Sequence, residues 1–325
     1  MYKERLYLSG EEGAGVKMFK YLKAHGAGVL YGILLIGFTI YLLMDTFLVS
    51  KVYRAEEKTE QQNPIQKENE LEDVQENLVN EEVSKTSYDD GKILVDLQEY
   101  REEGTNIYVA DIVLSSSEYL KTAFAQNSYG KNVTEKTSEI ATEANAILAI
   151  NGDYYGAQEK GYVLRNGTLY RSEAEEGQED LVIYEDGSFE VISEEEITAE
   201  SLLEQGAQQI LSFGPALISE GTISVTEEDE VGKAMESNPR TAVGRIDDLH
   251  YVFVVSDGRT EESEGLSLLE LAEFMDRLGV ETAYNLDGGG SSTMYFNGEI
   301  INNPTTSGRS IQERSVSDIV YIGYE

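Results

Sequence analysis

Residues Tyr284-Asn-Leu-Asp-Gly-Gly-Gly-Ser-Ser-Thr-Met-Tyr295 place a single carboxylate, Asp287, at the mouth of a three-glycine turn that carries hydroxyl groups. The apolar residues before Asp287 predict the end of a buried strand. Glycines permit φ > 0, so that successive N–H groups can point at an anion, and hydroxyls add further donors. A tight turn that needs glycine only for steric reasons is the alternative. The residues of this predicted anion site are Gly288, Gly289, Gly290, Ser291, Ser292 and Thr293.

A second segment has the same order of features. Ala146-Ile-Leu-Ala-Ile-Asn-Gly-Asp-Tyr-Tyr155 follows a predicted helix, ends a predicted strand in Asn151-Gly152-Asp153, and leads to a hairpin at residues 163–170. Residues 294–301 form the corresponding predicted hairpin after Asp287. An old internal duplication would explain the likeness, and chance similarity of common strand and hairpin patterns is the competing explanation.

A third acid also follows an apolar run. Tyr251-Val-Phe-Val-Val255 predicts a strand, and Ser256-Asp257-Gly258-Arg259 comes directly after it. Strand ends that emerge at one crevice of a sheet gather side chains there. We therefore expect Asp153, Asp257 and Asp287 to face a shared cleft.

The remaining pattern from residue 91 onward mixes strands and short helices. Residues 106–114 are rich in strand-forming side chains, and Asp186-Gly187 predicts the turn of a hairpin. Residues 267–278 predict an amphipathic helix followed by a glycine cap. The predicted class is α+β, with mixed, largely antiparallel sheets and flanking helices, preceded by one transmembrane helix.

Composition excludes several kinds of function. The chain has 61 acidic and 25 basic residues in 325, a formal charge of −36 that repels nucleic-acid phosphates. It has no cysteine and two histidines, His25 and His250, so thiolate chemistry and a histidine metal cluster are both excluded. No cofactor is assigned with certainty. Any metal would be a hard cation such as Ca²⁺ bound by carboxylates.

The amino-terminal part predicts a membrane anchor. Residues 26–44 carry no charge, and the apolar run to residue 49 is long enough to span a bilayer. Lys17, Lys20 and Lys23 precede it, which favours a cytoplasmic amino terminus. A cleaved signal peptide and a buried core helix are the alternatives. The predicted division is a tail at 1–25, an anchor at 26–49, an acidic flexible stalk at 50–90 and a catalytic domain at 91–325.

Five segments together resemble motifs of the phosphodiester glycosidase family, in the order found there, and the resemblance covers residues 105–324. The family's Arg-Pro-Val is Arg314-Ser315-Val316 here, and the disulfides of its lysosomal members are absent because the chain has no cysteine. The segments are Asn151-Gly-Asp-Tyr-Tyr155, Asn238-Pro-Arg-Thr-Ala-Val-Gly244, Val255-Ser-Asp-Gly-Arg259, Asn285-Leu-Asp-Gly-Gly-Gly-Ser-Ser-Thr293 and Glu313-Arg-Ser-Val-Ser317.

The resemblance implies hydrolysis of the bond between a sugar anomeric carbon and a phosphodiester oxygen. It implies Arg240 and Arg314 as phosphate clamps, with Arg259 next, because a guanidinium can hold phosphate oxygens bidentately. Asp287 and Asp153 become the leading catalytic carboxylates, Asp257 is the third, and Asn151 joins the substrate-binding set.

The expected partners are a carbohydrate phosphodiester or cell-envelope glycopolymer and, through residues 26–49, a membrane, but not nucleic acid. The expected protein is a single-pass membrane hydrolase with an extracytoplasmic domain, acting in cell-envelope or exopolysaccharide metabolism as bacterial members of the family do. A non-catalytic surface module that binds anionic polysaccharide or cell-wall polymer is the alternative.

Overall fold

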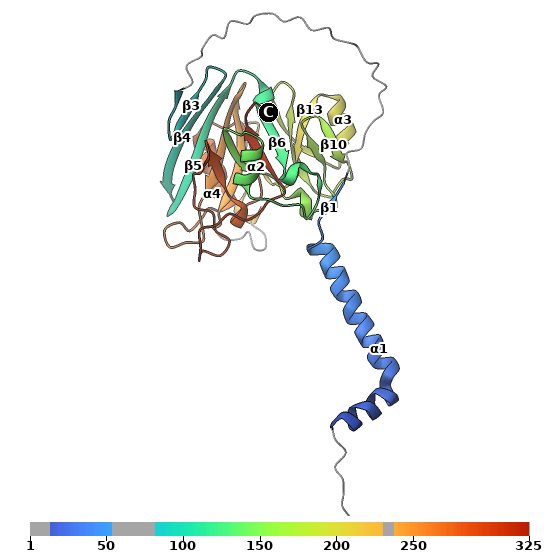
Figure 1. Cartoon of the computed structure of the whole chain (residues 1–325). Helices are drawn as coiled ribbons and strands as arrows, with labels where there is room; N and C mark the ends of the chain where they lie inside the picture. Colours follow the sequence, from blue (N-terminus) through green and yellow to red (C-terminus); the bar gives the residue numbers. More distant parts are fainter. Residues whose placement is uncertain (1–13, 54–81, 230–236, 325) are drawn as a thin grey trace, which may run out of the picture. The chain divides into compact units, whose positions relative to one another are not determined.

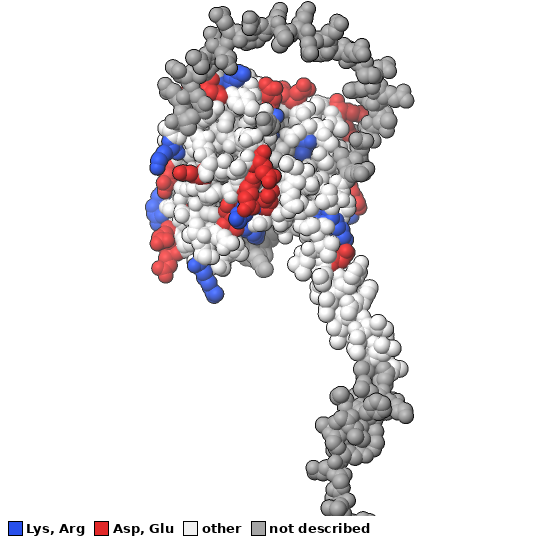
Figure 2. All heavy atoms as spheres, in the orientation of Figure 1, with Lys and Arg blue, Asp and Glu red and all other residues white. Residues whose placement is uncertain are grey.

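The computed structural model describes residues 14–53, 82–229 and 237–324, and divides the chain into a unit at 1–50 and a unit at 51–325 (Figure 1). The described residues of the first unit, 14–50, contain the helix α1 (Ala14–Phe47). Its segment Leu30–Phe47 is long and apolar enough to cross a membrane, and its side chains are almost all uncharged in Figure 2. The expected apolar helix is therefore present, although it begins well before residue 26.

The largest sheet of the second unit has nine strands, and every pairing in it is antiparallel. Its order is β15-β14-β18-β16-β17-β5-β4-β3-β2. The strands are β2 (Glu82–Val83), β3 (Ser87–Asp89), β4 (Ile93–Glu102), β5 (Thr105–Leu114), β14 (Ala216–Ser219), β15 (Thr222–Ile223), β16 (Arg240–Asp247), β17 (His250–Ser256) and β18 (Thr282–Asn285).

The described residues of the unit also form two five-stranded antiparallel sheets. One has the order β20-β19-β8-β21-β6 and the other β10-β9-β13-β11-β12. The first comprises β6 (Leu120–Phe124), β8 (Leu148–Asn151), β19 (Met294–Phe296), β20 (Glu299–Ile300) and β21 (Asp318–Ile322). The second comprises β9 (Val163–Arg165), β10 (Thr168–Arg171), β11 (Glu179–Tyr184), β12 (Phe189–Ser193) and β13 (Ala207–Leu211).

These sheets confirm the α+β class with antiparallel strands, and they change one boundary. The sequence assigned the segment of β2 and β3 to the stalk. Both strands belong to the nine-stranded sheet instead, where β3 pairs with β4 and Tyr88 of β3 is buried in the core. A short strand, β1 (Lys51–Val52), pairs with β7 (Gly130–Lys131). The rest of the expected stalk, residues 54–81, lies outside the described residues.

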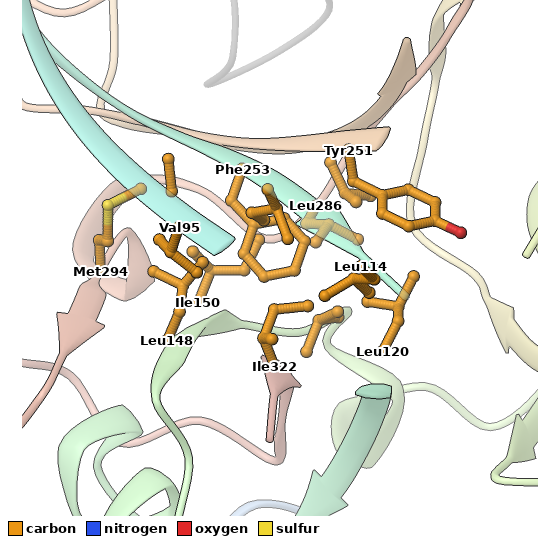
Figure 3. Packing of buried hydrophobic residues seen from close by; sticks show 14 of the residues in the cluster. Val95, Leu114, Leu120, Leu148, Ile150, Tyr251, Phe253, Leu286, Met294 and Ile322 are labelled. Atoms are coloured by element: carbon orange, nitrogen blue, oxygen red, sulfur yellow. The ribbon is translucent and has the colours of Figure 1, made fainter. Parts of the chain in front are cut away.

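A hydrophobic core lies where the three sheets meet. Ile150 of β8, Phe253 of β17 and Leu286 after β18 are fully buried in it, as Figure 3 shows. A second core lies beneath α4 (Leu268–Arg277), whose residues Leu271 and Met275 are fully buried. Ser267 and Glu270 form a capping box at the start of α4, which confirms the predicted helix. The two shorter helices are α2 (Thr137–Glu143) and α3 (Ala199–Glu204).

The two segments that resemble each other in sequence have the same order of elements. Helix α2, strand β8 and the hairpin β9–β10 correspond to helix α4, strand β18 and the hairpin β19–β20. Their partners differ, because β9 pairs with β13 whereas β19 pairs with β8 itself. The internal duplication stays a prediction.

One buried carboxyl in this fold lies beside a second carboxyl. Asp180 on β11 is fully buried, and its side chain interacts with those of Glu194 and Ser212. Burial raises the pKa of Asp180 well above its ordinary value, and the nearby Glu194 carboxyl raises it further. The folded state holds this proton more tightly than the unfolded state does. The free energy of unfolding should therefore fall as pH rises from the ordinary carboxyl pKa to the raised pKa of Asp180 in the folded state.

We expect Asp180→Asn to remove this loss of stability with rising pH. From about pH 4 upward, the wild-type free energy of unfolding should acquire an unfavourable slope from Asp180 of up to about 1.4 kcal/mol per pH unit. The variant should lack that slope, and denaturant titrations between mildly acidic and neutral pH measure the difference. Asp186→Asn is the control, because hydrogen bonds from Ser188 lower the pKa of Asp186 and its effect has the opposite sign. Parallel pH curves for wild type and Asp180→Asn would contradict the interpretation.

Candidate active site

Asp287 follows β18 and is held by the neighbouring sheet through its backbone. Its N–H donates to the Gly152 carbonyl at 3.3 Å, and its own carbonyl accepts from Asn151 Nδ2 at 2.6 Å. The side chain remains 13% exposed. The strand end therefore directs one carboxylate toward solvent while its backbone is fixed on both sides.

Arg314 is the direct partner of this carboxylate. Its Nη2 donates to Asp287 Oδ2 at 2.7 Å, and its Nε donates to Ser291 Oγ at 2.8 Å. Burial raises the pKa of Asp287 above its ordinary value, although Arg314 and the Ser291 hydroxyl act in the opposite direction. Asp287, Ser291 and Arg314 thus form one hydrogen-bonded group.

Two further arginines lie beside this group. Arg259 has a left-handed backbone with φ of 62°, and its guanidinium donates to Asn238 Oδ1 and, at 2.7 Å, to the Thr306 carbonyl. Arg240 on β16 is 5% exposed and donates from Nε to the Leu266 carbonyl at 2.8 Å. Burial and the charge of Arg314 both lower the pKa of Arg259. A bound anion would relieve this repulsion between cations.

These groups line a cavity of about 460 Å³. Among the residues predicted from sequence, it brings together Arg240, Arg259, Asp287, Gly288, Gly289 and Arg314. The cavity thus combines the carboxylates of Asp229 and Asp287 with three guanidinium groups, in a protein whose overall charge is strongly negative. Acidic side chains gather near the middle of the domain face in Figure 2, so an anion must be attracted locally.

Sequence reasoning missed several residues of this cavity. The sequence could have pointed to Asn238, because it is the first residue of the motif that contains Arg240. In the structure its Oδ1 accepts a hydrogen bond from the Arg259 guanidinium. The sequence could have pointed to Asn285 too, since it stands two residues before Asp287. Leu286 lies between these two residues in the same motif. No motif pointed to the other lining residues, which are Phe213, Gly214, Pro215, Asp229 and Leu268.

The three glycines are required first by packing. A side-chain carbon at Gly288 would lie 2.9 Å from the Pro239 carbonyl, and one at Gly290 would lie 2.5 Å from Thr306 Oγ1. At Gly289, φ is +63° and the added carbon would lie 2.7 Å from Arg259 Nη2. The Gly289 N–H already donates to Pro239 O. The turn therefore lets a guanidinium lie against its backbone, which differs from the predicted cradle of N–H groups.

Asp153 lies outside the large cavity, in the interior. Its Oδ2 accepts from Arg165 Nη2 and from the Ser212 N–H, each at 2.8 Å, and its side chain is fully buried. Arg165 also donates to Asp318. Burial and the charge of Asp153 raise the pKa of the Asp318 carboxyl to about 7. The expectation that Asp153 faces a shared cleft is wrong, because a buried arginine binds it from the inner side.

Asp257 is likewise turned inward. Its carboxylate accepts from the Asn303 N–H at 2.8 Å, from Asn303 Nδ2 at 2.9 Å and from Tyr108 Oη at 3.2 Å. It is 3% exposed and does not line the cavity. Its hydrogen bonds anchor the segment after β20, so its structural surroundings are those of a loop anchor. Its predicted presence at the common cleft is wrong, because Asn303 and Tyr108 bind the carboxylate in the interior.

The polar residues around the turn also serve its architecture. Asn151 is fully buried, and its Oδ1 accepts from Thr241 Oγ1 at 2.9 Å and from the Thr293 N–H at 3.2 Å. Ser291, Ser292 and Thr293 have no exposed surface. The expectation that these four residues contact substrate is not supported, because their side chains face the protein interior and none lines the cavity.

The expected Ca²⁺ site stays a prediction. The described residues include no group of three or more histidine, aspartate or glutamate side chains arranged to hold a metal ion. At the cavity, Asp287 is engaged by Arg314. Of the other strand-end acids, Asp153 is engaged by Arg165, while Asp257 accepts four hydrogen bonds or more from its neighbours.

We expect Gly289→Ala to displace the Arg259 guanidinium and to weaken phosphate binding about tenfold, because hydrogen bonds to charged groups contribute on this scale. It should also cost about 1 kcal/mol of stability, since alanine disfavours positive φ. Gly279→Ala is the matched control, with φ of +80° and nothing near the added carbon. Calorimetric titration with inorganic phosphate and thermal melts separate the effects. Equal phosphate affinity in both variants would contradict this geometry.

Comparisons with known proteins agree with the sequence motifs. The family model described as phosphodiester glycosidase matches residues 144–323. Protein YomE from the SPbeta prophage of Bacillus subtilis is 27% identical over 201 residues, which cover 60% of this chain and 31% of that protein. Mouse N-acetylglucosamine-1-phosphodiester alpha-N-acetylglucosaminidase is 30% identical over 181 residues, which cover 51% of this chain and 35% of the enzyme. The chain thus spans about a third of the length of these relatives.

Solved structures show the same fold. The catalytic domain of the zebrafish N-acetylglucosamine-1-phosphodiester alpha-N-acetylglucosaminidase, auto-inhibited by its pro-peptide, superposes with a TM-score of 0.58 at 21% identity, covering 72% of this chain and 83% of that one. A hypothetical protein from Synechocystis superposes with a TM-score of 0.50 at 14% identity, covering 71% and 62%. The family model covers more than half of the residues and agrees with the motifs around Asp287. The chain belongs to the phosphodiester glycosidase family.

Proposed function

We propose that the domain hydrolyses the bond between a sugar anomeric carbon and the phosphate of a sugar 1-phosphodiester. The observation that carries this proposal is the cavity in which Asp287 lies among Arg240, Arg259 and Arg314. The family assignment and the activity named for the mouse relative give the same reaction class.

The arginine side of the cavity suits the phosphate. Planar guanidinium groups bind phosphate oxygens with paired hydrogen bonds, and a partly buried site strengthens the attraction. Without a bound anion the positive charges of Arg259 and Arg314 repel each other, and this repulsion contributes to the lowered pKa of Arg259. Phosphate binding would convert that repulsion into two attractive contacts. The same groups would stabilise the negative charge that the phosphate gains as the bond breaks.

Asp287 is the carboxylate for the sugar side of the reaction. As the C–O bond breaks, the electron pair leaves with the phosphate, and positive charge develops at the anomeric carbon. Asp287 would stabilise that charge or accept a proton from the water that attacks the carbon. The products are a free sugar and a phosphomonoester. Because phosphate is already a good leaving group, a second carboxyl that protonates it is less necessary than for an ordinary glycoside.

We expect Asp287→Asn to lower kcat/KM by roughly a hundredfold or more, as loss of a catalytic carboxylate does. Arg259→Gln should lower it by about tenfold or more. The measurement is release of reducing sugar from a set of sugar 1-phosphodiesters that includes the N-acetylglucosamine compound. Asp276→Asn and Arg277→Gln, exposed on α4, are the controls and should leave activity unchanged.

Failure of the wild-type protein to release sugar from any of these compounds would overturn the hydrolase assignment. If the protein then bound anionic polysaccharide through the same arginines, the alternative of a non-catalytic surface module would take its place.

We further propose that α1 anchors the protein in the membrane, with the domain outside the cytoplasm and acting on a cell-envelope or exopolysaccharide glycopolymer. The apolar segment Leu30–Phe47 supports the anchor, and the lysines at 17, 20 and 23 support a cytoplasmic amino terminus. The absence of cysteine is compatible with either compartment, since only disulfide use would distinguish them.

Protease treatment of intact cells measures this topology. We expect protease added outside to degrade the domain while a cytoplasmic control protein remains intact, and fractionation should recover the full chain with membranes. If the chain is membrane-bound but the domain resists protease until the cells are permeabilised, α1 is an anchor and the domain lies in the cytoplasm, which would contradict the proposed orientation. Recovery of the full chain in the soluble fraction would contradict the anchor itself.

A further inference from the structure

Tyr154 has an unfavourable backbone conformation and an exposed ring. Its φ and ψ are 50° and 22°, in the left-handed region that bulky side chains rarely adopt. Its ring is 49% exposed, and it is among the few large apolar side chains of the domain that remain so. Holding such a residue there costs on the order of 1 kcal/mol or more, and strained residues of this kind cluster at functional sites.

The surrounding structure fixes Tyr154 in this conformation. The following N–H, that of Tyr155, donates to Asp153 Oδ1 at 3.0 Å, and the Gly152 N–H donates to the Asp318 carbonyl at 2.9 Å. A side-chain carbon at Gly152 would lie 2.3 Å from Asp318 Oδ1, so this backbone lies directly on the buried ion pairs with Arg165. The ring is therefore exposed on a rigid support.

Tyr154 lies beside the catalytic carboxylate, in a cavity that none of the three arginines lines. It lines a small cavity of about 30 Å³ together with Asp287, Thr134, Ser315 and Ser317. Asp287 also lines the large cavity, whereas Tyr154 does not. Asp287 is thus shared by a cavity that the arginines line and a cavity that an aromatic ring and hydroxyl-bearing residues line. The small cavity has room for a hydroxyl group or a water molecule, but a sugar ring would have to lie over the exposed tyrosine.

The two halves of a sugar 1-phosphodiester differ in the same way. One half is an anionic phosphate, and the other is a pyranose with an apolar C–H face and a rim of hydroxyls. Aromatic rings pack against apolar faces, and tyrosine does so while its hydroxyl stays in water. Binding sites combine such a surface with a few polar groups that fix orientation. The hydroxyls of Thr134 and Ser315, both on exposed residues, are available for that purpose.

We propose that the ring of Tyr154 is the binding platform for the sugar half of the substrate, across Asp287 from the arginines that bind its phosphate. This inference rests on the proposed function, because it assigns the sugar side of the same reaction. It also explains why two residues with a left-handed backbone, Tyr154 and Arg259, line the two cavities that share Asp287. Each presents one half of the substrate to the bond that breaks.

A tryptophan at this position reports sugar binding directly, because the chain has no tryptophan of its own. We would titrate full-length Tyr154→Trp in detergent with N-acetylglucosamine 1-phosphate, free N-acetylglucosamine and inorganic phosphate, and record tryptophan emission. Tyr324→Trp is the matched control, since Tyr324 is 46% exposed and lines neither cavity. We expect the sugar compounds to change the emission of Tyr154→Trp but not that of Tyr324→Trp. A response to phosphate alone, or none at all, would overturn the proposal.

Kinetics with an active substrate give a second measurement. Tyr154→Asn keeps a residue that tolerates the left-handed conformation but removes the ring, so it should raise KM about tenfold with little change in kcat. Tyr154→Phe should retain wild-type KM, and thermal melts check that both variants are folded. Equal KM for Tyr154→Asn and wild type would contradict the platform while leaving the hydrolase intact. The emission titration does not need turnover, so the two ideas can fail separately.

Discussion

The site depends on one buried amide, the side chain of Asn151. Its Nδ2 donates to the Asp287 carbonyl, and its Oδ1 accepts from Thr241 and from the N–H of Thr293. These three partners come from the end of β18, from β16 and from the glycine turn. Because Asn151, Thr241 and Thr293 are buried, leaving one of their polar groups unpaired would cost about 1–3 kcal/mol. A single side chain thereby joins the nine-stranded sheet to the smaller sheet that contains β8.

Around this junction, two kinds of charged contact have separate tasks. Inside, Arg165 lies between Asp153 and Asp318, with all three side chains at most 2% exposed. Such a buried group is costly to break and weak evidence for net stabilisation, but it fixes geometry. At the surface of the cavity, Arg314 and Asp287 remain 39% and 13% exposed. The outer pair stays accessible to a ligand because the inner group already holds the backbone in place.

Sequence reasoning found the outer pair and misread the inner one. Asp287 and Arg314 were identifiable because unusual glycine and serine neighbours mark the first, and a family motif marks the second. Asp153 and Asp257 share the pattern of an acid after an apolar strand, and that pattern does not say whether the side chain turns outward or inward. The answer depends on Arg165, Tyr108 and Asn303, which carry no motif of their own, and Tyr108 and Asn303 are also distant from Asp257 in sequence. The antiparallel sheets were predictable from strand patterns and hairpin turns, whereas which strands became neighbours was not.

The position of β21 has a consequence for how the protein is made. This strand, Asp318–Ile322, pairs with β8 on one side and β6 on the other, so it is an interior strand whose two neighbours are synthesised long before it. Until it arrives, β8 and β6 have unpaired edges, and Arg165 lacks Asp318. Arg314 is synthesised only a few residues earlier. Folding therefore cannot complete the cavity progressively as the chain emerges, and exposed strand edges in the interval make the nascent domain a substrate for chaperones.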